Sequence, residues 1–300
     1  MFFQKFRYHI LLHIIVFMWG FTGILGKLIH QDTLIIVWYR VLIAAFALAL
    51  FILIWKKSFQ IKSRKHIIPI IFVGIVVASH WLTFYYSIQL STASLGILCL
   101  STTTLHVSWL EPLVMKTKFS WLELLLGMIV ILGIYFISGD LNAEETTAMY
   151  FGLFSALLAA IFSVFNAKLA QDLPSYQITY YELLVGFLFL SVILFFQGRF
   201  NAEIFALSLT DVLWLLFLGI LCTSFAFLMT IEVVKKLGVF TVALSINLEP
   251  VYTIILAIFL LKEHEIVGPK FYLGALIIVL VVIANAFLKS KLNAVKNKAN

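Results

Sequence analysis

The chain has 300 residues, of which 63% are hydrophobic and 12% are charged, and its formal net charge is +7. Soluble domains average about 25% charged residues, so this composition, with a mean hydropathy of +1.09, excludes an ordinary soluble protein. The sequence predicts an all-α integral membrane protein.

Ten apolar stretches follow one another, each near the roughly 20 residues that a helix needs to cross a bilayer. The predicted spans are 9–29, 33–55, 67–88, 93–115, 121–138, 149–170, 176–197, 212–233, 239–261 and 267–288. The connectors are short and leave no room for a soluble domain. The first stretch contains Trp19 and Lys27 and lacks a small-residue cleavage site, so we interpret it as a retained helix and not as a signal peptide.

Basic residues gather on one side of the predicted bundle. The connectors on the N-terminal side hold Lys5, Arg7, Lys56, Lys57, Lys62, Arg64, Lys65, Lys116, Lys118, Lys168, Lys235, Lys236, Lys289, Lys291, Lys296 and Lys298. The opposite connectors hold Lys27, Arg199, Lys262 and Lys270. The positive-inside rule therefore predicts a multi-pass protein of the cell (inner) membrane with both termini in the cytoplasm. The charges form no single patch, which argues against nucleic-acid binding.

The ten spans divide into two sets of five, and an odd number of crossings inverts the second set relative to the first. The register pairs Tyr86 with Glu232, Thr103 with Glu249, and Thr117 with Glu263, each 146 residues apart. Nearer the start of each half, Lys27 pairs with Lys168 and Arg40 with Glu182. We expect one five-helix repeat over residues 1–141 and a second over 142–300, the second ending in a basic cytoplasmic tail.

Several short motifs carry a family resemblance. They are Trp19-Gly20 with Lys27 following, Tyr39-Arg40 before Ala44-Ala45, and the run from Lys235-Lys-Leu-Gly238 through Asn247-Leu-Glu-Pro250 to Leu260-Leu-Lys-Glu263 and Gly274. With these motifs the chain resembles the drug/metabolite transporter superfamily, specifically its EamA-type transporters. The resemblance implies ten helices in an inverted five-plus-five repeat, a substrate cavity between the halves, and uptake or export of small metabolites without ATP hydrolysis.

Glu249 is the most informative polar residue inside a predicted span. It lies about ten residues into its span, so its carboxylate falls near the membrane midplane, where ionisable groups usually face a cavity. We interpret Glu249 as a site for a proton or a substrate amine, with Pro250 loosening the helix beside it. The alternative is a neutral carboxyl group hydrogen-bonded across helices, for example to Asn247 or Thr103. Asn247 is retained as a candidate beside Glu249.

Arg40 and Glu182 occupy matching positions in the two halves. Arg40 falls nearer the outer edge and Glu182 nearer the inner edge, with roughly 11 Å of depth between them, so direct pairing is not expected. Our hypothesis is that Arg40 attracts anionic groups at the outer entrance and Glu182 attracts cationic groups at the inner one. The alternative is that each side chain snorkels toward its nearer interface.

His80, Trp81 and Tyr85 lie in the most polar and aromatic stretch of any span. An imidazole exchanges protons near neutral pH, and an indole face holds a cationic group, so this stretch suits an amino or planar metabolite. Packing is the alternative for His80. Trp19, together with the weaker candidates His106 and Asn166, either lines the same cavity or serves as interhelical packing.

Motifs for other functions are missing from the sequence. It has no phosphate-binding glycine loop, no Gly-x-Ser-x-Gly elbow and no metal-ligand spacing, so we expect no ATPase or hydrolase activity and no cofactor. We predict a secondary active transporter of a small organic metabolite, with amino acids or related amines as the leading class and a proton at Glu249 or His80 as a candidate coupling ion. The predicted partners are this substrate and the lipid bilayer; oligomeric state is left open. The alternatives are a non-transporting scaffold or sensor and an integral-membrane lipid-modifying enzyme.

Overall fold

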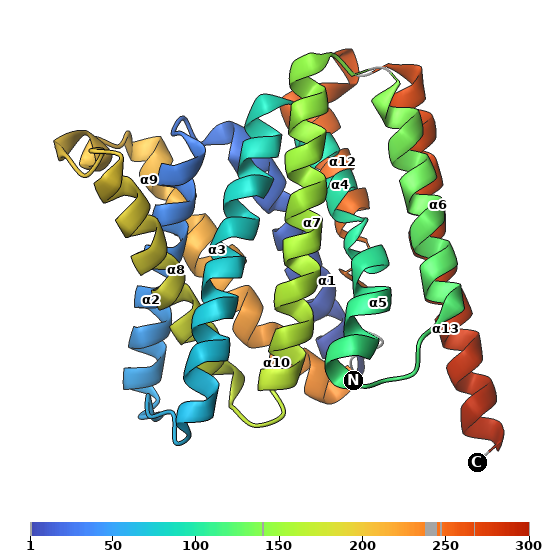
Figure 1. Cartoon of the computed structure of the whole chain (residues 1–300), viewed down its shortest axis with the longest axis horizontal. Helices are drawn as coiled ribbons and strands as arrows, with labels where there is room; N and C mark the ends of the chain where they lie inside the picture. The colour runs from blue at the N-terminus through green and yellow to red at the C-terminus, as the bar shows by residue number, and fades with distance from the viewer. Residues whose placement is uncertain (1, 140, 238–244, 247, 267, 300) are drawn as a thin grey trace.

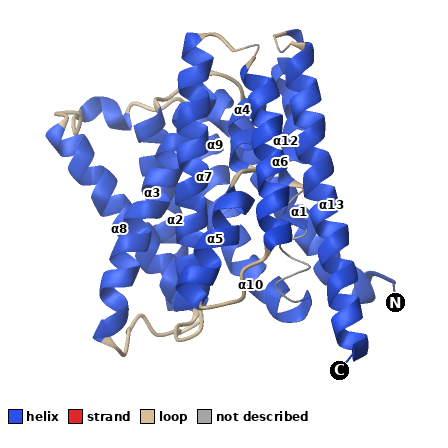
Figure 2. Ribbon diagram, turned by 45° about the vertical axis from the view of Figure 1, so that its right-hand side comes forward, coloured by secondary structure: helices blue, strands red, loops and turns tan. Residues whose placement is uncertain are grey.

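A computed structural model describes residues 2–139, 141–237, 245–246, 248–266 and 268–299, and every regular element in this part of the chain is helical (Figures 1 and 2). The α-helices are α1 (Phe2–Leu28), α2 (Thr33–Ile54), α3 (Ile67–Leu90), α4 (Ala93–Leu100), α5 (Thr103–Met115), α6 (Trp121–Ser138), α7 (Ala143–Leu169), α8 (Ser175–Phe196), α9 (Leu209–Leu216), α10 (Ala226–Leu237), α12 (Glu249–Leu261) and α13 (Pro269–Ala299). The remaining elements are the short 3₁₀ segments η1 (Arg64–His66), η2 (Ala202–Phe205) and η4 (Glu263–Glu265) and the π-helix η3 (Phe217–Phe225).

The helices match the apolar stretches of the sequence. Among the described residues, 7 helical segments are long and apolar enough to cross a membrane. Three shorter apolar helices, Leu124–Ser138, Glu249–Leu261 and Pro269–Val281, lie within the predicted fifth, ninth and tenth spans. The protein is therefore an all-helical, multi-pass membrane protein, and ten crossings remain a prediction.

The fourth predicted span is not one continuous helix. Residues 93–115 form α4 and α5, which are separated at Ser101 and Thr102. The Thr102 hydroxyl donates to the Cys99 carbonyl at 2.7 Å, and the Ser101 amide donates to the Leu98 carbonyl at 3.1 Å. These three-residue contacts replace the regular helical ladder, because a hydroxyl side chain competes for backbone acceptors. The predicted span is nevertheless confirmed as a helical segment of 23 residues, with this interruption inside it.

The backbone of the second half repeats this arrangement. Helices α5 and α12 begin at Thr103 and Glu249 and end at Met115 and Leu261, so both bounds are 146 residues apart. Each helix is followed by a lysine in the left-handed conformation, Lys116 with φ 56° and Lys262 with φ 55°. The register inferred from the sequence thus recurs in the lengths and caps of these two helices.

Glu263 lies inside the bundle, although it follows the end of a predicted span. Its side chain accepts hydrogen bonds from the backbone amides of Ala93 at 2.7 Å and Ser94 at 3.1 Å, and only 3% of the residue is exposed. A carboxylate at a helix N-terminus is stabilised by the unpaired amides and by the helix dipole. The segment after α12 therefore holds the start of α4 in place.

Helix α1 packs between α3 and α12, and glycines permit the close approach. A Cβ on Gly20 would lie 3.1 Å from the Tyr252 Cβ, and the Thr253 hydroxyl donates to the Gly20 carbonyl at 2.9 Å. A Cβ on Gly26 would lie 2.8 Å from Cδ1 of Tyr85 on α3. Larger side chains at either position would separate α1 from the helices that surround the centre of the bundle.

The connectors at the two ends of the bundle are joined by ion pairs. At one end, the Lys65 ammonium lies 2.9 Å from Asp172 and holds the pKa of that carboxyl below its usual range. At the other end, Arg199 pairs with Asp32. The start of α1 and the end of α13 both lie at the same end of the bundle as the connector between α2 and α3 (Figure 1). The connectors richest in lysine and arginine and both terminal helix ends thus share one face.

Helices α6 and α13 lie side by side at the edge of the bundle, and their contact provides a test of the packing (Figure 1). A Cβ on Gly274 would lie 2.4 Å from the Gly133 carbonyl oxygen and 2.5 Å from Cγ1 of Ile137. Overpacking of this kind typically costs about 1–3 kcal/mol. We expect Gly274→Ala to lower the Tm of the detergent-purified protein. Gly139→Ala, whose Cβ would meet nothing closer than 3.5 Å, is the matched control, and equal Tm values for the two variants would contradict this packing.

Candidate functional site

Arg40 is a buried cation in the first half of α2. Its Nε donates to the Thr223 hydroxyl at 3.0 Å, its Nη1 donates to the Tyr85 hydroxyl at 3.3 Å, and its Cζ lies 4.0 Å from the centroid of the Trp81 ring. Only 3% of the residue is exposed, and no carboxylate of the described residues lies within 4.0 Å of the guanidinium. Neutral dipoles and an aromatic face stabilise the charge incompletely, so the site favours an incoming anion.

Tyr85 and Trp81 connect Arg40 to both halves of the chain. The Tyr85 hydroxyl accepts from Arg40 and donates to the Thr22 carbonyl of α1 at 3.2 Å. Trp81 meets Phe227 edge-on at 6.3 Å between ring centroids, and Phe227 meets Trp19 at 5.9 Å. Trp81 and Phe227 stand 146 residues apart, so equivalent positions of the two repeats touch each other. The predicted residues Trp19, Arg40, Trp81 and Tyr85 therefore form one cluster.

Thr223 belongs to this cluster and was not among the sequence candidates. It lies in the π-helix η3, where its hydroxyl donates to the Leu218 carbonyl five residues earlier, at 2.8 Å. Gly219 lets η3 approach α2, because a Cβ there would lie 2.7 Å from Cγ2 of Ile43. Single π-turns occur frequently at functional sites. The available signal was the Thr223-Ser224 hydroxyl pair in an otherwise apolar span.

Glu249 begins α12 and is half-buried. The positive charge of Arg40 acts on its carboxyl group electrostatically, although no ion pair within 4.0 Å joins the two residues. Thr103, one suggested partner of Glu249, donates instead to the Ala156 carbonyl at 3.3 Å. Asn247, the other suggested partner, lies outside the described residues. The two repeats thus contribute one acid and one base to the same region of the bundle.

His80 is held by hydrogen bonds to α7, and its ring also lies 6.5 Å from the Trp81 ring of the Arg40 cluster. Its Nδ1 lies 2.9 Å from the Ser155 carbonyl oxygen and 2.8 Å from the Ser155 hydroxyl, which itself donates to the His80 carbonyl at 2.9 Å. Because a carbonyl only accepts, Nδ1 carries a proton. The ring also packs against Phe84 and Phe162. This geometry favours the packing alternative, in which His80 joins α3 to α7.

Glu182 lies in a separate polar contact between α7 and α8. Its Oε2 accepts from Nδ2 of Asn166 at 3.1 Å, and 4% of the residue is exposed. As expected, Arg40 and Glu182 have different partners and do not pair directly. His106 is half-buried and contacts Trp109 edge-on, away from both sites. The roles of Arg40 and Glu182 at the two entrances remain predictions.

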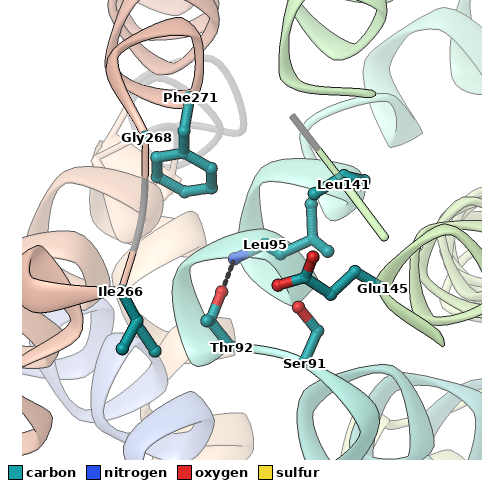
Figure 3. Close-up of a pocket in the computed structure, with 8 residues that line it drawn as sticks. All are labelled: Ser91, Thr92, Leu95, Leu141, Glu145, Ile266, Gly268 and Phe271. Atoms are coloured by element: carbon teal, nitrogen blue, oxygen red, sulfur yellow. Dashed lines mark hydrogen bonds between the residues drawn. The ribbon is translucent and has the colours of Figure 1, made fainter. Parts of the chain in front are cut away.

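A small pocket at one end of the bundle does not involve the candidate residues (Figure 3). Its volume is about 50 Å³, and it lies between the start of α4, the start of α7 and the connector before α13. It is lined by Ser91, Thr92, Leu95, Leu141, Glu145, Ile266, Gly268 and Phe271. A water molecule needs roughly 10–15 Å³ of such space, so this pocket admits a few waters and no organic metabolite. The Arg40 cluster with Glu249 is the better candidate for a substrate site.

The hydrogen bonds of Tyr85 give a direct test of the cluster. Tyr85→Phe leaves Arg40 Nη1 and the Thr22 carbonyl without this partner, and a buried polar group left unpaired costs about 1–3 kcal/mol. We expect a lower Tm in detergent. Tyr86→Phe is the matched control, because Tyr86 is 42% exposed and contacts Phe151 only through its ring. A Tm for Tyr85→Phe equal to that of the control would show that the hydroxyl does not support the buried cation.

Comparison with known proteins identifies the family. No curated protein matches the chain, whereas 26 chains of solved structures do. One of these, titled "Crystal structure of protein", has a TM-score of 0.68 and 12% sequence identity, over 95% of this chain and 99% of that chain, and it shows a shared fold alone. The sequence model of the EamA-like transporter family matches residues 6–139 and 146–287. Because these segments cover most of the chain, the protein belongs to the EamA-like transporter family and is a membrane transporter of small molecules.

Proposed function

We propose that the protein is a secondary active transporter of zwitterionic metabolites, with amino acids as the leading class. The observation that carries this proposal is the buried Arg40 guanidinium, whose partners among the described residues are neutral and which lies within the electrostatic reach of Glu249. A substrate carboxylate would pair with Arg40, and a substrate ammonium would pair with Glu249. A simple amine would leave Arg40 without an anion, so the geometry favours amino acids over amines.

The inverted repeat supports alternating access as the mechanism. We propose that residues 1–141 and 142–300 form the two repeats and that the complete protein crosses the membrane ten times. Helices α5 and α12 have equivalent bounds and equivalent left-handed caps, and both begin in the interior of predicted spans. Interrupted helices near the midplane of an inverted repeat are typical of substrate sites in secondary transporters.

The charge distribution supports one orientation in the membrane. The lysine-rich connector before η1 and the outer ends of α1 and α13 lie at the same end of the bundle (Figure 1). By the positive-inside rule, this end faces the cytoplasm of a cell whose inner membrane holds the protein. Arg40 would then lie in the outer half of the membrane and Glu182 in the inner half.

The proposal is tested first by ligand chemistry. Thermal shifts of the purified protein are compared for leucine, for isoamylamine, which lacks the carboxylate, and for isocaproate, which lacks the amine. Phenylalanine, phenethylamine and phenylpropionate form a second matched set. We expect stabilisation by an amino acid and a much smaller effect of either partial analogue. Equal stabilisation by the amine and the amino acid would exclude a role for Arg40 in carboxylate binding.

Variants of the two charged residues test the same site in proteoliposomes. Arg40→Lys keeps the charge but loses the planar, bidentate geometry, and Glu249→Gln loses the charge that would bind the ammonium. We expect each variant to weaken uptake affinity for radiolabelled leucine or phenylalanine at least tenfold, whereas Glu111→Gln, an exposed residue of α5, serves as the control. Uptake unaffected by both changes would refute the site.

The alternative functions predict different results in the same proteoliposomes. A scaffold or sensor predicts no uptake at all, and a lipid-modifying enzyme predicts turnover of lipid.

A further inference from the structure

The contact between Glu182 and Asn166 leaves two oxygen atoms without a hydrogen-bond donor. Asn166 Nδ2 donates to Glu182 Oε2 at 3.1 Å. The other carboxyl oxygen, Glu182 Oε1, and the amide oxygen, Asn166 Oδ1, are both buried and have no partner among the described residues. Buried polar atoms are normally paired, so two unpaired acceptors in one contact require an explanation.

Among the described residues of the helices packed around Glu182, none supplies a compensating positive charge. On α3, a Cβ at Gly74 would lie 2.8 Å from the Glu182 carbonyl oxygen, and the neighbouring residues Val73 and Val77 are apolar and buried. No lysine, arginine or histidine of the described residues lies within 4.0 Å of the carboxyl group. A bare carboxylate would therefore be buried with one hydrogen bond.

Titratable groups on the surrounding elements are engaged elsewhere or exposed. On α2, Arg40 is held by Thr223 and Tyr85, and on α3, His80 is held by Ser155. Lys168 of α7 and Lys236 of α10 are exposed. The others on these helices are Tyr39, Tyr85, Tyr86, Tyr150, Tyr176, Tyr180, Tyr181, Glu144 and Glu145, together with Glu232 and Lys235, whose side chains lie outside the described residues. Tyr181 donates to the Phe59 carbonyl at 2.8 Å.

We infer that Glu182 and Asn166 form a proton-binding site and that this site supplies the coupling proton of the transport cycle. One proton on Glu182 Oε1 turns an acceptor into a donor, and its hydrogen bond to Asn166 Oδ1 satisfies both unpaired oxygens at once. The Asn166 amide continues to donate to Oε2, so the neutral acid and the amide pair through two hydrogen bonds. Divalent cations require about six or more oxygen ligands, and this contact offers two.

The coupling role rests on the proposed function, whereas the protonation of Glu182 does not. When the inner half is closed, Glu182 is buried and must be neutral, because a carboxylate is not stabilised there. When the inner half opens, water reaches the carboxyl group, the O–H bond of the acid breaks, and the proton passes to water while the electron pair stays on the carboxylate. Reclosure then requires a new proton, and in the coupled cycle this proton enters from the outer solution while the outer half is open, so that each cycle carries one proton inward. The inner opening is thereby linked to proton exchange.

Infrared difference spectroscopy on the substrate-free protein tests the site itself. Spectra collected across a pH series in the Glu249→Gln background should contain the C=O stretch of a protonated carboxyl group at neutral pH, and Glu182→Gln should remove it. Asn166→Ala should shift the band to higher frequency, since the hydrogen bond to Oε2 is lost. Exchange of sodium for potassium should leave the band unchanged. A spectrum without a Glu182-dependent acid band at neutral pH would overturn the inference.

Proteoliposomes loaded with a pH-sensitive dye test the coupling. The probe is a radiolabelled mixture of the twenty standard amino acids, measured with and without a pH gradient. We expect Glu182→Gln to reduce both the gradient-driven accumulation and the accompanying proton flux at least tenfold relative to the wild-type protein. Glu182→Asp should retain part of both. Glu111→Gln is the control. A wild-type response to the gradient in Glu182→Gln, or a response to sodium in its place, would refute the coupling role. If the wild-type protein moves none of the mixture, the proposed amino-acid transport fails, and the infrared band decides the proton site alone.

Discussion

The arrangement at the centre of the bundle depends on placing the Arg40 guanidinium inside a membrane protein with no carboxylate of the described residues within 4.0 Å of it. Such a charge is tolerated only where dipoles and aromatic faces surround it, and here these come from two other elements, α3 and η3. Thr223 is presented to Arg40 by the π-helix, and the Tyr85 hydroxyl is held by its hydrogen bond to α1. The Trp81 ring packs edge-on against Phe227. Because these neutral groups stabilise the charge of Arg40 only in part, burying the charge costs free energy on folding. For the same reason, an anion that pairs with Arg40 would be bound favourably.

The two halves share their backbone plan and divide the chemistry between them. Equivalent positions hold Arg40 and Glu182, and other equivalent positions hold Thr103 and Glu249. In the proposed cycle the backbone repeat would supply two similar ways of closing the bundle, whereas the side chains would make the outer and inner halves chemically different. A transporter built in this way can bind one ligand at the centre and respond to another ion on one side, because symmetry of the chain does not impose symmetry of the sites.

Sequence patterns predicted the helical segments and the separation of Arg40 from Glu182, because both follow from hydrophobic length and helical rise. The 146-residue register came from pairing residues of the two halves. These patterns did not predict the break at Ser101 and Thr102, since hydropathy does not report whether a hydroxyl group competes for backbone hydrogen-bond acceptors. The burial of Glu263 and the role of Thr223 were also missed. Both depend on contacts between residues about 170 to 180 positions apart, which no local pattern contains.

The membrane potential acts differently on the two proposed sites, because their ligands differ in net charge. A zwitterion adds no net charge, so the balance between Arg40 and Glu249 is the same whether the central site is empty or occupied. A proton at Glu182 changes the charge of the inner half by one elementary unit, and moving one unit across the membrane is worth about 2.3 kcal/mol per 100 mV. In the proposed cycle the membrane potential therefore acts on the step that loads Glu182 and not on the substrate. Because the two sites are separate, the movement of a charged proton at Glu182 can drive the transport of a substrate that has no net charge.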